Sequence, residues 1–234
     1  MNDKSGHQTS TQNIIHKRNM DGIITSCTVP NTVALTFDDG PYYYTPQLLD
    51  YLDSWGVKAT FFMNGDSVGK IEKFKDVVER VYNDGHQIAS HTWGHADLSL
   101  LSLHEIAFQM TRLDTALKDI IGVRPVYMRP PYGSVNDVSL DYLNSKGYKI
   151  IKWTIDTNDW KHDGDATASM GPYEEALSSF DAHDRGFISL MHDTHPTTVA
   201  HLVPAAIQYA HDRGFKMVTV GECLGYPRSK WYRN

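Results

Sequence analysis

The alternation of short apolar runs with helical patterns constrains the fold of this chain more than any other feature. Seven runs rich in apolar, β-branched or aromatic residues lie near 32–37, 58–63, 86–89, 125–129, 148–154, 187–191 and 216–220. Helical patterns lie between most of them, near 45–55, 71–83, 102–121, 136–146, 172–182 and 199–212. Strands that alternate with helices favour a mostly parallel sheet, and seven such strands favour an α/β barrel.

Local signals mark the ends of the helices. Ser102 and Glu105 form a capping-box pattern at the start of the third helix. Six glycines stand where a helical pattern gives way to the next strand, the position at which a left-handed residue often ends a helix. They are Gly56, Gly85, Gly122, Gly147, Gly186 and Gly214. There is no linker or internal repeat after residue 30, so we expect a single domain.

The composition excludes several classes of protein. Of the 234 residues, 41% are hydrophobic and 21% are charged, which is typical of a globular protein. The formal net charge is −6 and there is no long basic run, so we expect no nucleic-acid partner. No stretch approaches the roughly 18–20 apolar residues of a membrane span. The first 22 residues are polar and show no signal peptide; if the protein is secreted, we expect its leader to have been removed.

Two cysteines flank the predicted strands. Cys27 precedes the first run and Cys223 follows the last. The first and last strands of a closed barrel are neighbours, and a disulfide between these residues would contribute about 4–5 kcal/mol in the chain-entropy model. The alternative is two unrelated buried thiols, because the count alone does not decide. We predict the disulfide.

Chemically active side chains follow the carboxyl ends of the predicted strands, which form the working face of such folds. They are Asp38 and Asp39 after the first run, His91 and His95 after the third, Arg129 and Tyr132 after the fourth, Asp156, Asp159 and Trp160 after the fifth, and His192 and His195 after the sixth. No comparable set stands at the strand entries. We therefore expect one rim of the barrel to carry the site.

His91 and His95 suggest a metal site, since residues four apart share one face of a helical turn, although such pairs are also common on surfaces. With one of the paired aspartates as third ligand they suit Zn²⁺ or another divalent ion. The residue after His91 is Thr92, not the Glu of the H-E-x-x-H motif, so the other aspartate would take the proton from water. Alternatively, Asp-Asp-Gly-Pro is only a turn.

Five ordered segments resemble the motifs of the polysaccharide deacetylases, carbohydrate esterase family 4. They are T-F-D-D-G, H-T-W-G-H, R-P-P-Y, D-T-N-D-W and L-M-H, over residues 36–192. The flanking strands extend the likeness to about 27–226, which sets apart a polar N-terminal segment, 1–26, and a C-terminal tail, 227–234. The segments GHQIASHTWGHADLS and TVGECLG are most similar to the fungal chitin deacetylase branch. The resemblance implies a distorted (β/α) barrel with fewer than eight strands.

The same resemblance implies hydrolysis of N-acetyl groups on N-acetylglucosamine units of chitin or chitooligosaccharides. Asp39, His91 and His95 would be the ligands of a divalent metal, Zn²⁺ first and Co²⁺ as the alternative. Asp38 would be the catalytic base, and Arg129 would hold it charged and oriented. A separate acid and base can keep opposite protonation states at one pH.

The resemblance assigns the remaining roles on the same rim. His192 would protonate the leaving amine, and Asp159 would orient both His192 and Arg129. Tyr132 would offer its backbone N–H to the oxyanion. Trp160 and Leu190 would wall the pocket for the acetyl methyl. Because aromatic rings stack on sugar faces, we also expect substrate contacts from the rim residues Tyr132, Trp93 and Tyr43.

Three further residues near the rim have simpler interpretations. His195 is expected in a loop or as a cap before Pro196, Asp156 at the end of its strand, and Trp153 in the core. The alternative activities for the same site are an acetylxylan esterase and a peptidoglycan N-acetylglucosamine deacetylase. A non-catalytic glycan-binding module is disfavoured because base, acid, oxyanion donor and ligands are all present. We expect a monomer that is secreted or located in the cell wall.

Overall fold

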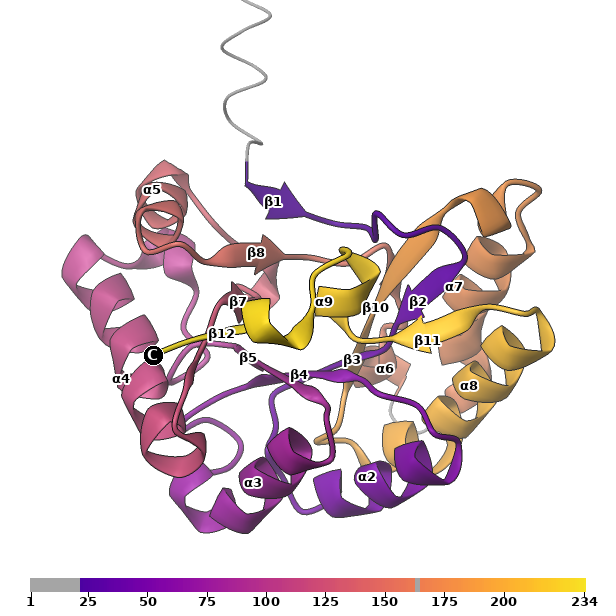
Figure 1. The fold of residues 1–234 in the computed structure, drawn as a ribbon, viewed down its shortest axis with the longest axis horizontal. Coiled ribbons are helices and arrows are strands. Elements are labelled where there is room, and N and C mark those ends of the chain that lie inside the picture. The colour runs from indigo at the N-terminus through magenta and orange to yellow at the C-terminus, as the bar shows by residue number, and fades with distance from the viewer. Residues whose placement is uncertain (1–21, 163–164) are drawn as a thin grey trace, which may run out of the picture.

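The computed structural model describes residues 22–162 and 165–234. Most of the N-terminal segment set apart in the sequence, 1–26, therefore lies outside the described residues. The structure has the expected α/β fold, with a mostly parallel central sheet inside a layer of helices (Figure 1). Among the described residues, no helix is both long and apolar enough to cross a membrane.

Within the described ranges, ten strands form the central sheet, and almost every strand is short. They are β1 (Ile23–Ile24), β2 (Thr32–Ala34), β3 (Thr36–Asp38), β4 (Thr60–Met63), β5 (Gln87–Ser90), β7 (Tyr127–Met128), β8 (Lys149–Ile151), β9 (Ile155–Asp156), β10 (Gly186–His192) and β11 (Lys216–Val218). Two more strands, β6 (Arg124–Pro125) and β12 (Tyr232–Arg233), pair with each other in antiparallel fashion.

The pairings, together with one chain connection from β8 to β9, trace an irregular ring, which is the distorted barrel. Strand β3 pairs with β4, β4 with β5, β5 with β7, and β7 with β8. The chain then continues from β8 into β9, which pairs with β10, and β10 pairs back onto β3. Strands β2 and β11 extend the sheet beside β10, and β1 extends it beside β8.

The strand count was predicted too low, at about seven. Three apolar runs each break into two strands, because the chain changes partners partway along the run. In the first run, β2 pairs with β10 and β11, whereas β3 pairs with β4 and β10. In the fifth, β8 pairs with β7 while β9 pairs with β10. A hydrophobic pattern reports burial but does not report such a change of partner.

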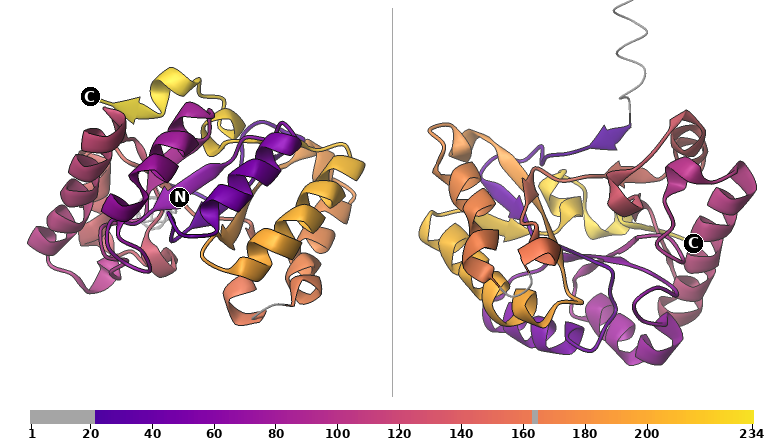
Figure 2. Two further views of the ribbon diagram at one scale, coloured as in Figure 1. Left: turned by 90° about the horizontal axis from the view of Figure 1, so that it is seen from below. Right: turned by 180° about the vertical axis from the view of Figure 1, so that it is seen from behind.

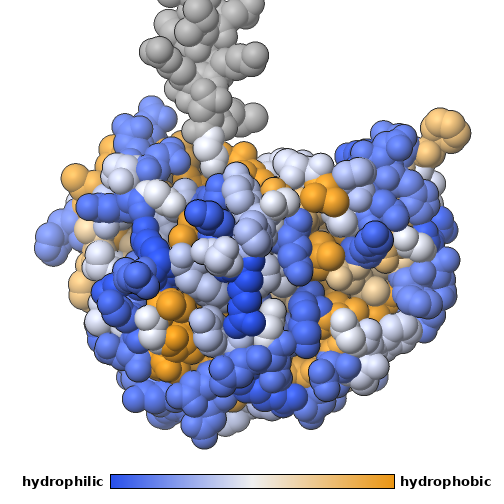
Figure 3. Space-filling model, in the orientation of Figure 1, coloured by the Kyte–Doolittle hydropathy of each residue, from blue (hydrophilic) through white to orange (hydrophobic). Residues whose placement is uncertain are grey.

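The longer helices cover the outside of the barrel, as the three views in Figures 1 and 2 show. They are α2 (Thr45–Ser54), α3 (Lys75–Asn83), α4 (Leu103–Ile121), α5 (Asp137–Ser145), α7 (Ala166–Ser178) and α8 (Val203–Asp212), and two short helices are α6 (Asp159–His162) and α9 (Val220–Cys223). The capping box of Ser102 and Glu105 is present at the start of α4. In the orientation of Figure 1, apolar residues lie in separate patches on a largely hydrophilic surface (Figure 3).

The helix expected at 172–182 lies earlier, because Asp165 caps it through the N–H of Ala168 and Pro172 is tolerated inside it. Gly186 accordingly does not end a helix but opens β10. A Cβ at this position would lie 2.5 Å from the Cβ of Cys27, so the glycine permits the close approach of these two segments.

Cys27 and Cys223 form a disulfide, as predicted. The first and the last predicted apolar runs contain β2 and β11, which are parallel neighbours. Residues 227–234, which the sequence set apart as a tail, pack against the domain. Trp231 is buried in the same cluster as the disulfide. The Tyr232 hydroxyl accepts a hydrogen bond from the N–H of Ile88 in β5.

Candidate active site

Asp39, His91 and His95 converge at the carboxyl ends of β3 and β5. The Oδ1 atom of Asp39 lies 3.3 Å from Nε2 of His95 and 3.6 Å from Nε2 of His91. One ligand atom from each residue lies within 4.8 Å of the other two. Asp39 Oδ1 is buried and has no hydrogen-bond partner among the described residues. A buried carboxylate oxygen facing two imidazole nitrogens fits a divalent cation.

Strained loops, not a helical turn, bring the two histidines together. Residues 91–95 have no helical structure, and Thr92 and His95 have φ of 70° and 54°. Asp39 has φ of 74°. Left-handed backbone costs a non-glycine residue about 1–3 kcal/mol and concentrates at functional sites. His91 and His95 thus lie close together, as expected, but a loop and not a helical turn places them there.

The surroundings of His91 prepare it to bind a cation through Nε2. Its Nδ1 donates a hydrogen bond to the carbonyl of Arg129 at 2.8 Å. Burial lowers the pKa of His91 to about 3, although the charge of Asp39 opposes this shift. The ring is therefore neutral at ordinary pH, and its Nε2 lone pair faces Asp39.

Asp38 is buried beside Asp39 but has a different partner. Its Oδ1 accepts a hydrogen bond from Nη1 of Arg129 at 2.7 Å. Arg129 is fully buried and also donates to Thr36 Oγ1 and to the carbonyl of Lys152. Burial raises the pKa of Asp38, and the charge of Arg129 opposes that rise. A raised pKa makes a carboxylate a better acceptor for a proton.

His192 ends β10 and is held by Asp159, the first residue of α6. The Nδ1 atom of His192 lies 2.8 Å from Oδ1 of Asp159, and its backbone N–H donates to Oδ2. Burial disfavours the imidazolium, but the bond to Asp159 and the charges of Asp38 and Asp39 outweigh burial. The pKa of His192 is raised to about 9. At neutral pH His192 therefore carries a proton that it can donate.

Asp159 was also expected to orient Arg129, and the structure does not show this contact. Among the described residues, the acceptors of the Arg129 guanidinium are Asp38, Thr36 and Lys152. Its face lies over the ring of Phe62, with 4.2 Å between Cζ and the ring centroid. Asp159 begins the short helix α6, which turns its carboxylate toward His192 instead.

One cavity of about 440 Å³ joins these groups. Its walls include most of the predicted site residues, namely Asp38, Asp39, His91, His95, Tyr132, Trp160, Leu190 and His192. Sequence reasoning missed that Trp153, Asp156 and His195 also line it. Trp153 was expected in the core, but its run breaks between β8 and β9, and its indole N–H donates to Asp156 Oδ2.

Trp93 and Tyr43 do not line this cavity, contrary to expectation. Trp93 is buried in the main core cluster, with the Arg112 guanidinium 4.0 Å above its ring. Tyr43 is exposed and packs edge-on against Phe74, with 5.2 Å between ring centroids. A position at the carboxyl end of a strand thus does not by itself direct a side chain into the site.

Tyr132 lines the cavity from a turn with left-handed backbone. It lies in the 3₁₀ turn η3 (Pro131–Gly133) with φ of 59°. The first N–H groups of such a turn have no acceptor within the turn. The side chain is 70% exposed, and its ring centroid lies 4.7 Å from that of His95.

Comparison with known proteins identifies the family of this chain. Residues 25–151 match the family model of polysaccharide deacetylase. A chitin deacetylase from a Pestalotiopsis species is 50% identical over 91% of this chain and 70% of its own length. A probable peptidoglycan-N-acetylglucosamine deacetylase from Arthroderma benhamiae is 46% identical over 90% of this chain, which spans only 48% of that protein.

A solved structure provides a further comparison. The chitin deacetylase of the fungal pathogen Colletotrichum lindemuthianum superposes with a TM-score of 0.87 at 40% identity, over 90% of this chain and 95% of that one. The chain therefore belongs to the polysaccharide deacetylase family. Members of this family depend on a metal, and among the described residues the Asp39–His91–His95 cluster could hold one.

Proposed function

We propose that this protein removes N-acetyl groups from N-acetylglucosamine units of chitin or chitooligosaccharides and releases acetate. The observation that carries the proposal is the convergence of two differently paired acid–base groups, Asp38 with Arg129 and His192 with Asp159, beside the Asp39–His91–His95 cluster in one cavity. The names of the relatives from Pestalotiopsis and Colletotrichum support chitin as the polymer.

Asp39, His91 and His95 would hold the metal, for which we propose Zn²⁺ with Co²⁺ as the alternative. One carboxylate oxygen and two imidazole nitrogens suit these borderline cations and leave positions for water and substrate. When bound, such an ion lowers the pKa of water and polarises the acetyl carbonyl.

The residues around this site supply the proton transfers. Asp38 takes a proton from the attacking water, and Arg129 keeps its carboxylate in place. The backbone N–H of Tyr132 donates to the oxyanion of the tetrahedral intermediate. His192 then gives its proton to the leaving amine, and Asp159 keeps the ring oriented. Trp160 and Leu190 form the apolar wall against the acetyl methyl.

Peptidoglycan is the second candidate substrate, because the relative from Arthroderma benhamiae bears that name and peptidoglycan contains the same acetamido sugar. An acetylxylan substrate is less favoured. An amine is a poorer leaving group than an alcohol, so an amide makes fuller use of the protonated His192.

Acetate release from chitopentaose, peptidoglycan and acetylated xylan, measured side by side with and without a chelator, tests the proposal. We expect release from chitopentaose to be fastest, to stop on chelation and to return with Zn²⁺ or Co²⁺. Full activity in a preparation shown by elemental analysis to be free of metal would refute the metal-dependent mechanism. If acetate is released faster from peptidoglycan than from chitopentaose, peptidoglycan and not chitin is the substrate.

We also propose that the protein works outside the cell or in the cell wall, because the Cys27–Cys223 disulfide suits an oxidising compartment. A monomeric state stays a prediction, which light scattering after size-exclusion chromatography tests.

A further inference from the structure

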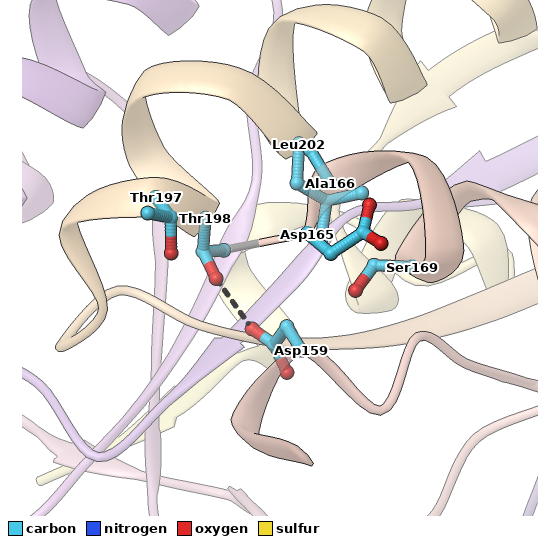
Figure 4. Close-up of a pocket in the computed structure, with 7 residues that line it drawn as sticks. All are labelled: Asp159, Asp165, Ala166, Ser169, Thr197, Thr198 and Leu202. Carbon is cyan, nitrogen blue, oxygen red and sulfur yellow. Dashed lines mark hydrogen bonds between the residues drawn. The ribbon is translucent and has the colours of Figure 1, made fainter. Parts of the chain in front are cut away.

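Thr198 lies behind the His192–Asp159 pair and contacts it from a separate element. It opens η5 (Thr198–Leu202), and its side chain is buried. Its Oγ1 donates a hydrogen bond to Oδ2 of Asp159 at 2.8 Å, and Figure 4 shows the two side chains pointing toward each other. Neither the motifs nor the proposed mechanism assigns this threonine a role.

Among the described residues, the Asp159 carboxylate has four donors, and Thr198 differs from the other three. His192 donates through its ring Nδ1 and its backbone N–H, and Trp160 donates through its backbone N–H. These three come from Asp159's own neighbour in the chain or from the residue that Asp159 has to hold. Of the donors that the structure describes, Thr198 is the one that ties the carboxylate to a third segment, the turn that precedes α8.

Two other polar side chains near Asp159, those of Asp165 and Ser169, have partners elsewhere. A small cavity of about 10 Å³ separates Asp159 from the start of α7 (Figure 4). Of the side chains on its wall, Asp165 caps Ala168 and Ser169 pairs with His162 Nδ1. Among the described residues, Thr198 is therefore the side chain of this cavity that donates to Asp159.

The local backbone shows a second unusual feature at the same residue. Residues 198–202 form a π-helical turn, which leads directly into α8. Such turns are rare and occur often at functional sites. Here the wide turn begins at the residue whose hydroxyl reaches Asp159, so the irregular backbone and the hydrogen bond occur together.

We propose that Thr198 is a positioning residue for His192, the proposed proton donor. The Thr198 hydroxyl fixes the rotamer of Asp159, and Asp159 in turn holds Nδ1 of His192. Nε2 is then the ring nitrogen that faces the substrate cavity. The inference rests on the proposed role of His192 as the proton donor. Thr198 touches neither the substrate cavity nor the reacting atoms and acts only through Asp159.

Several charges face His192, and Thr198 acts on one of them. The titratable groups around the imidazole are Asp159, Asp38, Asp39, His195 and Asp193. Loss of the Thr198 hydroxyl frees Asp159 to rotate and removes a donor that favours its charged form. The pKa of His192 then falls, because the imidazolium loses part of the anionic partner that raises it.

Three substitutions separate the hydroxyl of Thr198 from its methyl group. Thr198→Val keeps the shape and removes the donor, Thr198→Ser keeps the donor, and Thr198→Ala removes both. Thr60→Val is the matched control, since Thr60 is equally buried, bonds Gln87, and lies at the opposite end of the barrel where β4 begins. It loses a buried hydroxyl without touching Asp159.

In the zinc-loaded full chain we expect Thr198→Val to lower kcat roughly tenfold with little change in KM, the scale of one lost hydrogen bond to a charged group. The alkaline limb of the pH–rate profile should shift to lower pH by roughly half a pH unit to one pH unit. Thr198→Ser should retain wild-type behaviour, and Thr60→Val should leave the limb in place. If Thr198→Val does not fold, kcat and the alkaline limb are compared between Thr198→Ser and Thr198→Ala, which also differ in the hydroxyl donor.

Nuclear magnetic resonance titration of ¹⁵N-labelled histidines, with His192 assigned by its loss in His192→Gln, reads the effect without activity. We expect the pKa of His192 to fall in the Thr198→Val and Thr198→Ala variants but not in Thr198→Ser. An unchanged pKa of His192 in both Thr198→Val and Thr198→Ala would overturn the positioning role. Equal losses of kcat in Thr198→Ser and Thr198→Ala would also overturn it. A shifted pKa in a protein that releases no acetate would instead reject the proposed function and keep the placement of Thr198.

Discussion

At the scale of the residue, Asp38 and Asp39 show how two adjacent carboxylates acquire different surroundings. Asp38 is hydrogen-bonded to the buried Arg129, whereas Asp39 has left-handed backbone and turns an unpartnered oxygen toward two histidines. The change of backbone conformation between them sends the side chains to different partners. A Thr-Phe-Asp-Asp-Gly segment that only closed a strand would need neither partner.

Asparagine substitutions should separate the two aspartates. Asp38→Asn should stay folded with full metal content, because no ligand is lost, yet its activity should fall roughly a hundredfold or more, the scale of a lost general base. Asp39→Asn should bind metal more weakly, since an amide oxygen is a poorer ligand than a carboxylate. Elemental analysis and acetate release with added Zn²⁺ measure both effects.

Excess Zn²⁺ should restore part of the activity of Asp39→Asn and none of that of Asp38→Asn. His192→Ala is the matched control, because it removes a proton donor without removing a ligand and should resemble Asp38→Asn. If excess metal rescues Asp38→Asn and not Asp39→Asn, the two roles are reversed. If neither substitution changes activity, the segment is a turn and the mechanism is wrong.

The pairing of His192 with Asp159 predicts the alkaline limb of the pH profile. The pKa of His192 is raised to about 9, so its proton is present at neutral pH and lost as the pH rises through that value. Activity should fall there. Asp159→Asn removes the anionic partner and should move the limb to lower pH, which initial rates from pH 6 to 10 measure. A limb that stays in place in Asp159→Asn would show that another group supplies the proton.

At the scale of the element, the strand exits explain why so much of the site was predictable. The proposed ligands, base and acid occupy three of the five motifs, those that leave β3, β5 and β10, and parallel strands bring their carboxyl ends to one rim. The direction in which a side chain points was harder to predict than its position at the end of a strand. Trp153 and Trp93 were assigned to core and site, and the structure places them the other way round, because the break between β8 and β9 and the packing of Arg112 are tertiary features.

The last eight residues form elements of the domain, not an appendage. Strand β12 pairs with β6, and the indole of Trp231 lies so close to α9 that a Cβ on Gly221 would be 1.9 Å from its Nε1. The sequence shows only a short polar segment with two aromatic residues. Neither its length nor its composition signals an antiparallel partner more than a hundred residues away.

Trp231→Ala should therefore destabilise the whole domain. Loss of a large aromatic side chain from a packed cluster costs about 3–5 kcal/mol. Urea unfolding followed by far-UV circular dichroism measures the change. Phe180→Ala is the matched control, because Phe180 is fully exposed and its removal should leave stability nearly unchanged. Equal stability of the two variants would show that 227–234 contributes nothing to the fold.

At the scale of the whole molecule, the Cys27–Cys223 disulfide joins the two ends of the described domain. It spans a sequence separation of 196 residues, and the backbone N–H groups of Thr28 and Val29 also donate to the carbonyl of Cys223. It lies beside the β2–β11 pairing, away from the strand exits that carry the site. The bond is therefore placed to restrict the unfolded chain without contacting the reacting groups.

Removal of this disulfide should lower stability and spare catalysis. A crosslink that closes so long a loop contributes up to about 5 kcal/mol in the chain-entropy model, so the Cys27→Ser/Cys223→Ser double variant should unfold at clearly lower urea concentration. Its kcat at 25 °C should stay near that of the wild type, because the β2–β11 hydrogen bonds and the buried cluster around Trp231 persist. Thiol titration of the denatured, unreduced wild type should find no free thiol. Two titratable thiols would contradict the crosslink and remove the support it gives to an extracellular location, and unchanged stability of the double variant would show that pairing alone closes the barrel.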